Sequence, residues 1–271
     1  MQSFVAAVVQ LKSGSDKAAN LAEASRLIGE AADAGAQLVA LPEVFAWRGP
    51  QSAEPAEAET VPGPITEEMG ALARRLGIHI VAGSILEAAA GGPLPFNTTT
   101  LLAPDGRLLG AYRKIHLFDI DLPGRVTIRE SDLRAPGAQP VCVTTELGRI
   151  GLAICYDLRF PELFRALADR GAEIIVMPSA FTKPTGEAHW EPLLRARAIE
   201  NQCFVLAPNQ FGTNTQGFAN YGNSLLVDPW GKVLARGADD RAEVLTAHLD
   251  GDLLARVRRE LPCLEHRRLR P

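Results

Sequence analysis

An internal repeat is the feature that most constrains how this 271-residue chain can fold. Residues 32–45 and 168–181 align without a gap at a constant offset of 136 positions, and six of the 14 aligned pairs are identical. In both segments a glycine precedes a short apolar run that ends at a proline, Pro42 in the first and Pro178 in the second. Two copies of one strand ending predict an α/β fold with internal pseudo-two-fold symmetry and two packed sheets.

The segments around the repeat have the periodicities that such a fold requires. Residues 4–10 form an apolar run, residues 20–34 place apolar side chains at helical spacing, and residues 37–43 form a second short strand. In the second half, residues 149–155 and 161–168 repeat the order of strand and helix. The sequence therefore predicts a β-α-β unit in each half.

Two stretches lack this order. Residues 119–140 contain charges, prolines and glycines without periodicity, which predicts a long loop of the kind that often carries function. The tail, residues 252–271, combines a short helix with an arginine cluster that Glu260 and Glu265 interrupt, so we predict a solvated face or a subunit contact rather than a nucleic-acid surface. No linker separates the halves, and we predict a single domain over residues 1–271.

The net charge indicates what kind of partner the protein binds, and the cysteines indicate in which compartment it works. The net charge of −4 gives no reason to expect nucleic acid, and a small molecule is the expected partner. The four cysteines form no C-x-x-C pair, which is typical of a reducing compartment. Because the N-terminus lacks a basic leader and no apolar run approaches the ~20 residues of a membrane span, we expect a soluble, cytoplasmic protein with no membrane partner.

Cys155 stands where an apolar strand turns abruptly polar, with Tyr156 and Asp157 after it. A lone cysteine in a strand is most often a small buried hydrophobe, and Cys142 and Cys203 fit that description because apolar residues adjoin them. The position of Cys155 favours a nucleophile instead. A thiol with its ordinary pKa of ~8.5 is mostly protonated at neutral pH, so such a nucleophile needs a base nearby.

Glu43 and Lys114 are the candidates for the groups that Cys155 would need. None of the five histidines is tied to Cys155 by its position in the sequence. Glu43 ends a predicted strand, where open α/β sheets place ligands, and could serve as base, although a solvated glutamate or a helix cap is an ordinary alternative. Lys114 also ends an apolar strand and could stabilise an oxyanion, although exposed lysines at strand ends are common.

Several other enzyme classes lack support because their motifs are missing. The sequence contains no G-x-S-x-G, no H-E-x-x-H, no P-loop and no G-x-G-x-x-G. It also has no spacing of ligands that indicates a metal site. We therefore expect neither a metal nor a cofactor.

Three segments, met in order along the chain, resemble the three sequence blocks of the nitrilase superfamily of carbon-nitrogen hydrolases. They are Leu41-Pro42-Glu43, residues 112–117 and residues 155–163. Residues 188–202, 227–231 and 261–268 are similar to the Nit branch of that superfamily, which contains deaminated-glutathione amidases and omega-amidases.

The resemblance implies a four-layer α-β-β-α sandwich and assigns a role to each motif residue. Cys155 would attack the amide carbon, and Glu43 would act as general base and then as acid toward the departing amine. Lys114 and the backbone amide of Tyr156 would hold the oxyanion. Glu130 resembles a second glutamate that members of the family place beside this site.

The residues after the cysteine bear on the substrate. True nitrilases usually have Cys-Trp-Glu, whereas Cys-Tyr-Asp at residues 155–157 resembles the amidase side of the superfamily. The leading expectation is deaminated glutathione, cleaved to 2-oxoglutarate and Cys-Gly, and the alternative is an omega-amidase acting on 2-oxoglutaramate or a similar monoamide. An inactive binding or scaffold protein is a third reading, against which the intact set of Glu43, Lys114 and Cys155 argues.

Four residues near the second repeat are expected to bind substrate: Tyr156, Arg159, Phe181 and Thr182. Arg159 is chosen by its charge, since the expected substrate carries a carboxylate. A structural ion pair with Glu162 or Asp157 is the alternative for it.

Residues 211–223 depart from the pattern of the Nit branch. Many members have histidine where Asn214 and Asn223 stand, and a basic residue near Phe218 or Ala219. We expect this segment to decide which substrate is accepted. The resemblance also implies a homodimer or a larger homo-oligomer.

Overall fold

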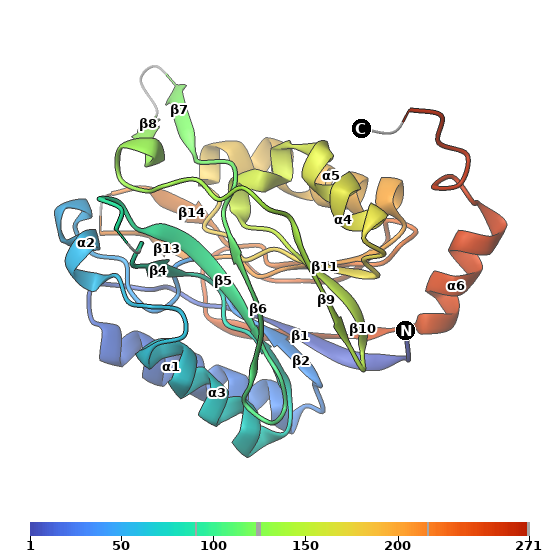
Figure 1. The fold of residues 1–271 in the computed structure, drawn as a ribbon, viewed down its shortest axis with the longest axis horizontal. Coiled ribbons are helices and arrows are strands. Elements are labelled where there is room, and N and C mark those ends of the chain that lie inside the picture. Colours follow the sequence, from blue (N-terminus) through green and yellow to red (C-terminus); the bar gives the residue numbers. More distant parts are fainter. Residues whose placement is uncertain (90, 123–125, 216, 270–271) are drawn as a thin grey trace.

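The computed structural model describes residues 1–89, 91–122, 126–215 and 217–269, and two large β-sheets packed against each other form its centre (Figure 1). The strands of the first sheet follow the order β17 (Glu243–Leu249), β1 (Phe4–Gln10), β2 (Leu38–Ala40), β3 (His79–Val81), β5 (Phe96–Leu102) and β4 (Ile85–Glu87), with β6 (Leu108–Arg113) also paired to β5. The second sheet has the order β16 (Val233–Arg236), β15 (Leu225–Val227), β12 (Phe204–Ala207), β11 (Ile174–Val176), β10 (Gly148–Leu152) and β9 (Val141–Thr145).

Helices cover the outer face of each sheet. Helices α1 (Lys17–Asp33) and α3 (Pro64–Leu76) pack on the first sheet, and α4 (Pro161–Asp169) and α5 (Lys183–Asn201) pack on the second (Figure 1). The layers are therefore α-β-β-α, as the sequence resemblance implied. The short helix α2 (Glu54–Glu57) and the C-terminal helix α6 (Gly251–Glu260) lie outside these layers.

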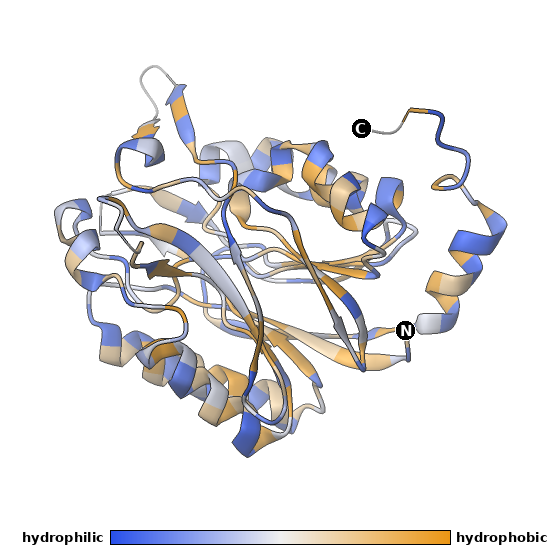
Figure 2. Ribbon diagram, viewed as in Figure 1, coloured by the Kyte–Doolittle hydropathy of each residue, from blue (hydrophilic) through white to orange (hydrophobic). Residues whose placement is uncertain are grey.

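The side chains of β1 alternate between two cores. Ala6 and Val8 belong to the core that lies between the sheets and continues under α4 and α5, whereas Ala7 and Val9 belong to the core under α1 and α3. Both faces of the strand are thus buried, which explains why its sequence is continuously apolar. Figure 2 shows the same distribution, with hydrophobic residues concentrated in the inner strands and both kinds mixed on the helices.

The pseudo-two-fold symmetry predicted from the repeat is present in the topology. In the first half, β1, α1, β2, α3 and β3 give three parallel strands, and β10, α4, β11, α5 and β12 do the same in the second half. Antiparallel strands flank each set, β17 and β5 in one sheet and β9 and β15 in the other. The two repeat segments thus contain β2 and β11, which occupy equivalent central positions.

The residues that follow these two strands meet each other. Glu43 and Ser179 are equivalent in the repeat, and the backbone N–H of Glu43 donates to the carbonyl of Ser179 at 3.3 Å. The next backbone N–H, that of Ala180, donates to Glu43 Oε2 at 2.9 Å. The carboxyl ends of the two sheets therefore face one another, which brings their loops into a common site.

Residues 119–140 differ from the predicted loop. Strands β7 (Asp119–Leu122) and β8 (Val126–Arg129) pair as a hairpin, and the 3-10 helix η2 (Glu130–Asp132) follows. The prediction was wrong because polar and apolar residues alternate over only four residues in each strand, a run too short to stand out among the charges, prolines and glycines around it. A second small hairpin joins β13 (Phe211–Thr213) and β14 (Ala219–Tyr221).

The C-terminal tail lies partly against the body of its own chain. Arg258 donates to the carbonyls of Ala172 and Gln202, at 2.7 and 3.1 Å, and Arg267 forms an ion pair with Asp169. At least two members of the arginine cluster thus have structural partners.

Among the helices that the structure describes, none has the length and apolarity needed to cross a membrane.

Candidate active site

Cys155 lies just beyond the carboxyl end of β10. Its backbone N–H donates to the carbonyl of Pro178 at 3.0 Å, which ties it to the loop after the neighbouring strand β11. Its φ of +46° is in the left-handed region, which is uncommon for a residue with a side chain and clusters at functional sites. Cys155 begins the 3-10 helix η3 (Cys155–Arg159), and its side chain lines a cavity.

Glu43 follows β2 and lines the same cavity. Its carboxylate is fixed on both oxygens: Oε1 accepts from Lys114 Nζ at 2.9 Å and from Asn97 Nδ2 at 2.8 Å, while Oε2 accepts from the N–H of Ala180. Only 4% of this glutamate is exposed. The solvated glutamate considered from the sequence is therefore not what the structure contains.

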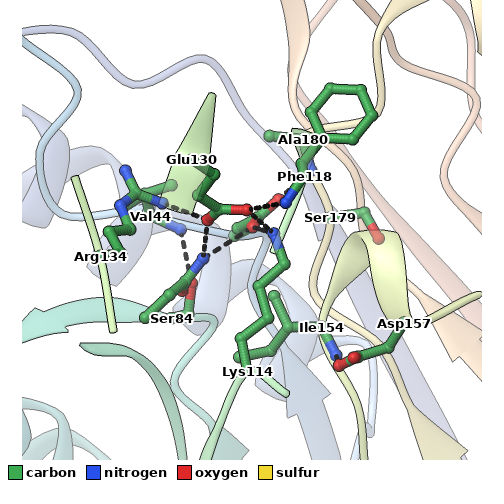
Figure 3. Close-up of polar contacts among 12 residues, drawn as sticks. Val44, Ser84, Lys114, Phe118, Glu130, Arg134, Ile154, Asp157, Ser179 and Ala180 are labelled. Carbon is green, nitrogen blue, oxygen red and sulfur yellow. Dashed lines mark hydrogen bonds and ion pairs between the residues drawn. The ribbon is translucent and has the colours of Figure 1, made fainter. Parts of the chain in front are cut away.

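Lys114 follows β6 and is 2% exposed, so it is not a surface lysine either. Its ammonium lies between two carboxylates, 2.9 Å from Glu43 Oε1 and 2.7 Å from Glu130 Oε2 (Figure 3). An ammonium has three N–H donors, and the described residues use two of them, which leaves one.

Glu130 is the centre of a second set of contacts. Besides Lys114, its Oε2 accepts from the N–H of Phe118 at 2.7 Å, and its Oε1 accepts from Arg134 at 2.9 Å (Figure 3). Arg134 is in turn held by both oxygens of Glu54, at 2.8 and 3.0 Å. The result is a buried chain of alternating charges behind Lys114, in which each carboxylate is paired.

The electrostatics differ sharply between the buried acids. Burial raises the pKa of the Cys155 thiol, and the charge of Glu43 raises it further, so the thiol is neutral at physiological pH. Burial also acts to raise the pKa of Glu130, but Lys114 and Arg134 outweigh it and bring that pKa down to about 2. For Lys114, burial favours a lower pKa, yet Glu130 and Glu43 keep it above its ordinary value.

The residues that line the cavity include only one of the four side chains predicted to bind substrate. Thr182 lines it together with residues of the segment 211–223, namely Asn214, Thr215, Phe218 and Asn220. Tyr156, Arg159 and Phe181 are not among the lining residues. The guanidinium of Arg159 instead lies over the rings of Tyr156 and Phe181, with centroid distances of 5.6 and 5.2 Å. These three side chains form a separate cluster that does not line the cavity, and their contact with substrate stays a prediction.

Several site residues were not foreseen from the sequence. Asn97, Arg134 and Arg48 belong to none of the catalytic motifs that the sequence offers. Arg134 follows Glu130 by four positions, a spacing at which side chains meet on a helical turn, but the surrounding residues have no helical periodicity. Arg48 follows Glu43 by five positions and lines the cavity, which no local pattern indicates.

Asp157 links the loop of Cys155 to that of Lys114. Its carboxylate is completely buried and accepts from Tyr112 Oη at 2.7 Å, from the N–H of Ile154 at 2.9 Å and from the N–H of His116 at 3.1 Å. The Nδ1 of His116 is also 2.7 Å from Asp157. A histidine therefore does reach the cysteine loop, but it contacts Asp157 and not the thiol.

Within the described residues, no cluster of three or more histidine, cysteine, aspartate or glutamate side chains could hold a metal ion. The chemistry available at the site is that of a thiol, a fixed carboxylate and an ammonium with one donor unused. This set can support nucleophilic attack on a carbonyl, proton transfer and stabilisation of an oxyanion.

Comparison with known proteins gives consistent matches along the chain. A family model described as carbon-nitrogen hydrolase matches residues 5–259. Human omega-amidase NIT2 is 40% identical over 270 residues, which cover 99% of this chain and 96% of that protein. The deaminated glutathione amidase of Synechocystis sp. strain PCC 6803 / GT-S is 39% identical over 270 residues, with 98% and 99% covered. Saccharomyces cerevisiae Nit3, a member of branch 10 of the nitrilase superfamily, superposes with a TM-score of 0.89 at 33% identity, covering 99% of this chain and 97% of that one.

Proposed function

Because the chain belongs to the carbon-nitrogen hydrolase family and is an amidase, we propose that it hydrolyses the ω-amide of a short dicarboxylic acid through a thioester on Cys155. The observation that carries this proposal is the position of the Lys114 ammonium. It lies between Glu43 and Glu130 at the cavity that Cys155 lines, with one N–H donor left for a substrate oxygen.

In the first half of the reaction, Cys155 Sγ attacks the amide carbon while its proton passes to Glu43. The carbonyl oxygen becomes an oxyanion, which accepts from the free donor of Lys114 and from the backbone N–H of Tyr156. That N–H is among the first amides of the helix η3, which have no partner within the helix. Glu43 then returns the proton to the nitrogen, the C–N bond breaks, and the amine leaves a thioester on Cys155.

In the second half, water attacks the thioester carbon and gives its proton to Glu43. The oxyanion forms at the same donors, the C–S bond breaks, and the thiolate recovers the proton from Glu43 as the free acid leaves. Glu130 takes no proton in this scheme. Its low pKa of about 2 keeps it charged, and its role is to position Lys114.

The segment 211–223 favours ammonia over a peptide as the leaving group. Deaminated glutathione and 2-oxoglutaramate present the same acyl group, but the first releases Cys-Gly, which carries its own carboxylate. The segment contains no charged residue, and its side chains at the cavity are neutral. An ammonia leaving group needs no cation on this wall, which supports 2-oxoglutaramate-like amides, with deaminated glutathione as the second candidate because an amidase of that name is a 39% identical relative.

The test is a comparison of these two substrates, with the Cys155→Ala variant as blank. We expect release of ammonia from 2-oxoglutaramate at a higher kcat/KM than release of Cys-Gly from deaminated glutathione. Intact-protein mass spectrometry of the quenched reaction should show the acyl group on wild-type protein and not on Cys155→Ala. The reverse order of kcat/KM would make deaminated glutathione the substrate, and the absence of both turnover and mass shift would favour a binding or scaffold protein.

A further inference from the structure

Arg48 is held at the cavity by a rigid segment. Its backbone N–H donates to the carbonyl of Gly14 at 2.8 Å, and its own carbonyl accepts from Thr215 Oγ1 at 3.0 Å. The preceding side chain, Trp47, is 7% exposed, and it lies so close over Gly49 that a Cβ there would be 2.2 Å from the ring. The loop that carries Arg48 is therefore fixed on both sides of it.

The guanidinium of Arg48 lacks the partners that the other cations of the site have. Within the described part of the chain, no carboxylate lies within ion-pair distance of it, and its buried Nη1 has no hydrogen-bond partner. Lys114 and Arg134, in contrast, are each held by two carboxylates. A buried donor without a partner is costly, and native structures retain such groups mainly where a ligand or water completes them.

Among the described residues that line the cavity, Arg48 is the cation that no carboxylate pairs. Three carboxylates and three cations line it: Glu43, Glu54, Glu130, Lys114, Arg134 and Arg48. The carboxylates are all hydrogen-bonded to the first two of these cations. A planar guanidinium with free N–H groups matches a carboxylate geometrically, because it can donate two parallel hydrogen bonds. Burial lowers the pKa of Arg48, and a bound anion would oppose that effect.

We propose that Arg48 binds the carboxylate at the end of the substrate opposite the amide and thereby selects ω-amides of dicarboxylic acids over neutral amides. This inference rests on the proposed function, since it concerns the substrate of the same site. It makes Arg48 a specificity-determining residue that touches the substrate away from the reacting atoms.

Succinamate and butyramide provide a matched test, because they differ only in a carboxylate that replaces a methyl group. In Arg48→Gln we expect kcat/KM for succinamate to fall by about 10- to 100-fold, the effect of losing a hydrogen bond between charged groups, while the value for butyramide changes little. Arg48→Lys should recover part of the loss. Lys12→Gln, which removes an exposed cation that does not line the cavity, should behave as wild type. Equal losses on both substrates in Arg48→Gln would overturn the proposal.

A binding measurement separates this inference from the proposed function. Calorimetry should detect succinate binding to the wild-type protein and to Cys155→Ala, with binding lost or weakened at least about tenfold in Arg48→Gln. If succinate binds equally to Arg48→Gln with an unchanged melting temperature, Arg48 does not recognise carboxylates. If no amide is hydrolysed but succinate binding still depends on Arg48, the proposed reaction fails while the assignment of Arg48 stands.

Discussion

At the scale of single residues, the neutral thiol of Cys155 sets what Glu43 has to do. Burial and the carboxylate of Glu43 both raise the pKa of the thiol, so Glu43 opposes the thiolate in the resting protein. The same carboxylate is the group that we propose as the base that removes the thiol proton. Its contribution must then come from accepting the proton during attack, and not from stabilising a thiolate beforehand.

Glu43→Gln should therefore separate thiol acidity from activity. Removing the negative charge should lower the pKa of Cys155, because the charge of Glu43 is among the causes that raise it. The amidase kcat should nevertheless fall by about 10²- to 10⁴-fold, the usual contribution of a general base. Ultraviolet absorbance of the thiolate against pH, with Cys155→Ala as the blank for the other cysteines, measures the first quantity, and steady-state kinetics measures the second.

Glu68→Gln is the matched control, since it removes an exposed glutamate on α3 that does not line the cavity. It should leave both the pKa of Cys155 and kcat unchanged. A higher thiol pKa in Glu43→Gln would show that Glu43 stabilises the thiolate, and an unchanged kcat would remove it from the mechanism.

Sequence motifs singled out Glu43, Lys114, Glu130 and Cys155, and the structure brings these four side chains to one cavity. Their roles remain predictions. Arg48 could not be found in the same way, because what distinguishes it is a missing partner, and partners depend on contacts between distant segments. The choice of Arg159 by charge alone had the same weakness, since charge does not say which surface a side chain faces.

At the scale of elements, Asp157 fixes the geometry between the loop of β6 and the helix η3. Tyr112 lies in β6 and His116 in the loop after it, whereas Ile154 directly precedes η3, and four short contacts converge on the carboxylate of Asp157. Arg197 of α5 adds two donors to the carbonyl of Leu158 from the other side. Lys114 and Cys155, which belong to these two segments, are thus held in register through contacts that their neighbours make.

Asp157→Asn should lower both stability and activity. An amide side chain can accept at only one of its two heavy atoms, so buried donors lose a partner, at a cost of roughly 1–3 kcal/mol in the free energy of unfolding. Misplacement of the Cys155 loop should lower kcat by at least about tenfold, because small displacements of reacting groups are costly. Urea denaturation and steady-state kinetics on one preparation measure both effects.

Tyr112→Phe is the companion variant that keeps the carboxylate. It removes the hydroxyl that donates to Asp157 at 2.7 Å and accepts from the N–H of Ile115 at 3.2 Å, and it leaves Asp157 with its other donors. We expect a loss of about 1–3 kcal/mol in the free energy of unfolding, because two hydrogen bonds are lost, and a kcat near that of wild type. If Asp157→Asn loses stability while its kcat is unchanged, the network stabilises the fold but does not position the site.

At the scale of the whole molecule, the two halves share their core and their site. Strand β1 near the N-terminus pairs with β17 near the C-terminus from Phe4–Leu249 to Gln10–Glu243, and the core between the sheets contains residues of both halves. The sequence predicted the symmetric halves because both repeat segments keep the same strand ending. It could not predict that β17 joins the first sheet, because pairing between strands so far apart leaves no local pattern.

The predicted single domain implies that both halves unfold in one transition, although each contains a similar β-α-β-α-β unit. Weakly coupled repeats can unfold separately, whereas a shared core favours cooperativity. The tryptophans offer a reporter in each half: Trp47 is buried in the first, Trp190 is buried in α5 of the second, and Trp230 is 63% exposed.

Two double variants isolate these reporters, Trp190→Phe/Trp230→Phe for the first half and Trp47→Phe/Trp230→Phe for the second. In each variant the urea midpoint from tryptophan fluorescence should coincide with that from far-ultraviolet circular dichroism, although the two variants differ in overall stability. A fluorescence transition that precedes the circular dichroism transition in one variant would reveal an independently unfolding half. Since Glu43 and Cys155 come from different halves, activity in such a protein should disappear with the less stable half, whereas a single domain should lose activity and both signals together.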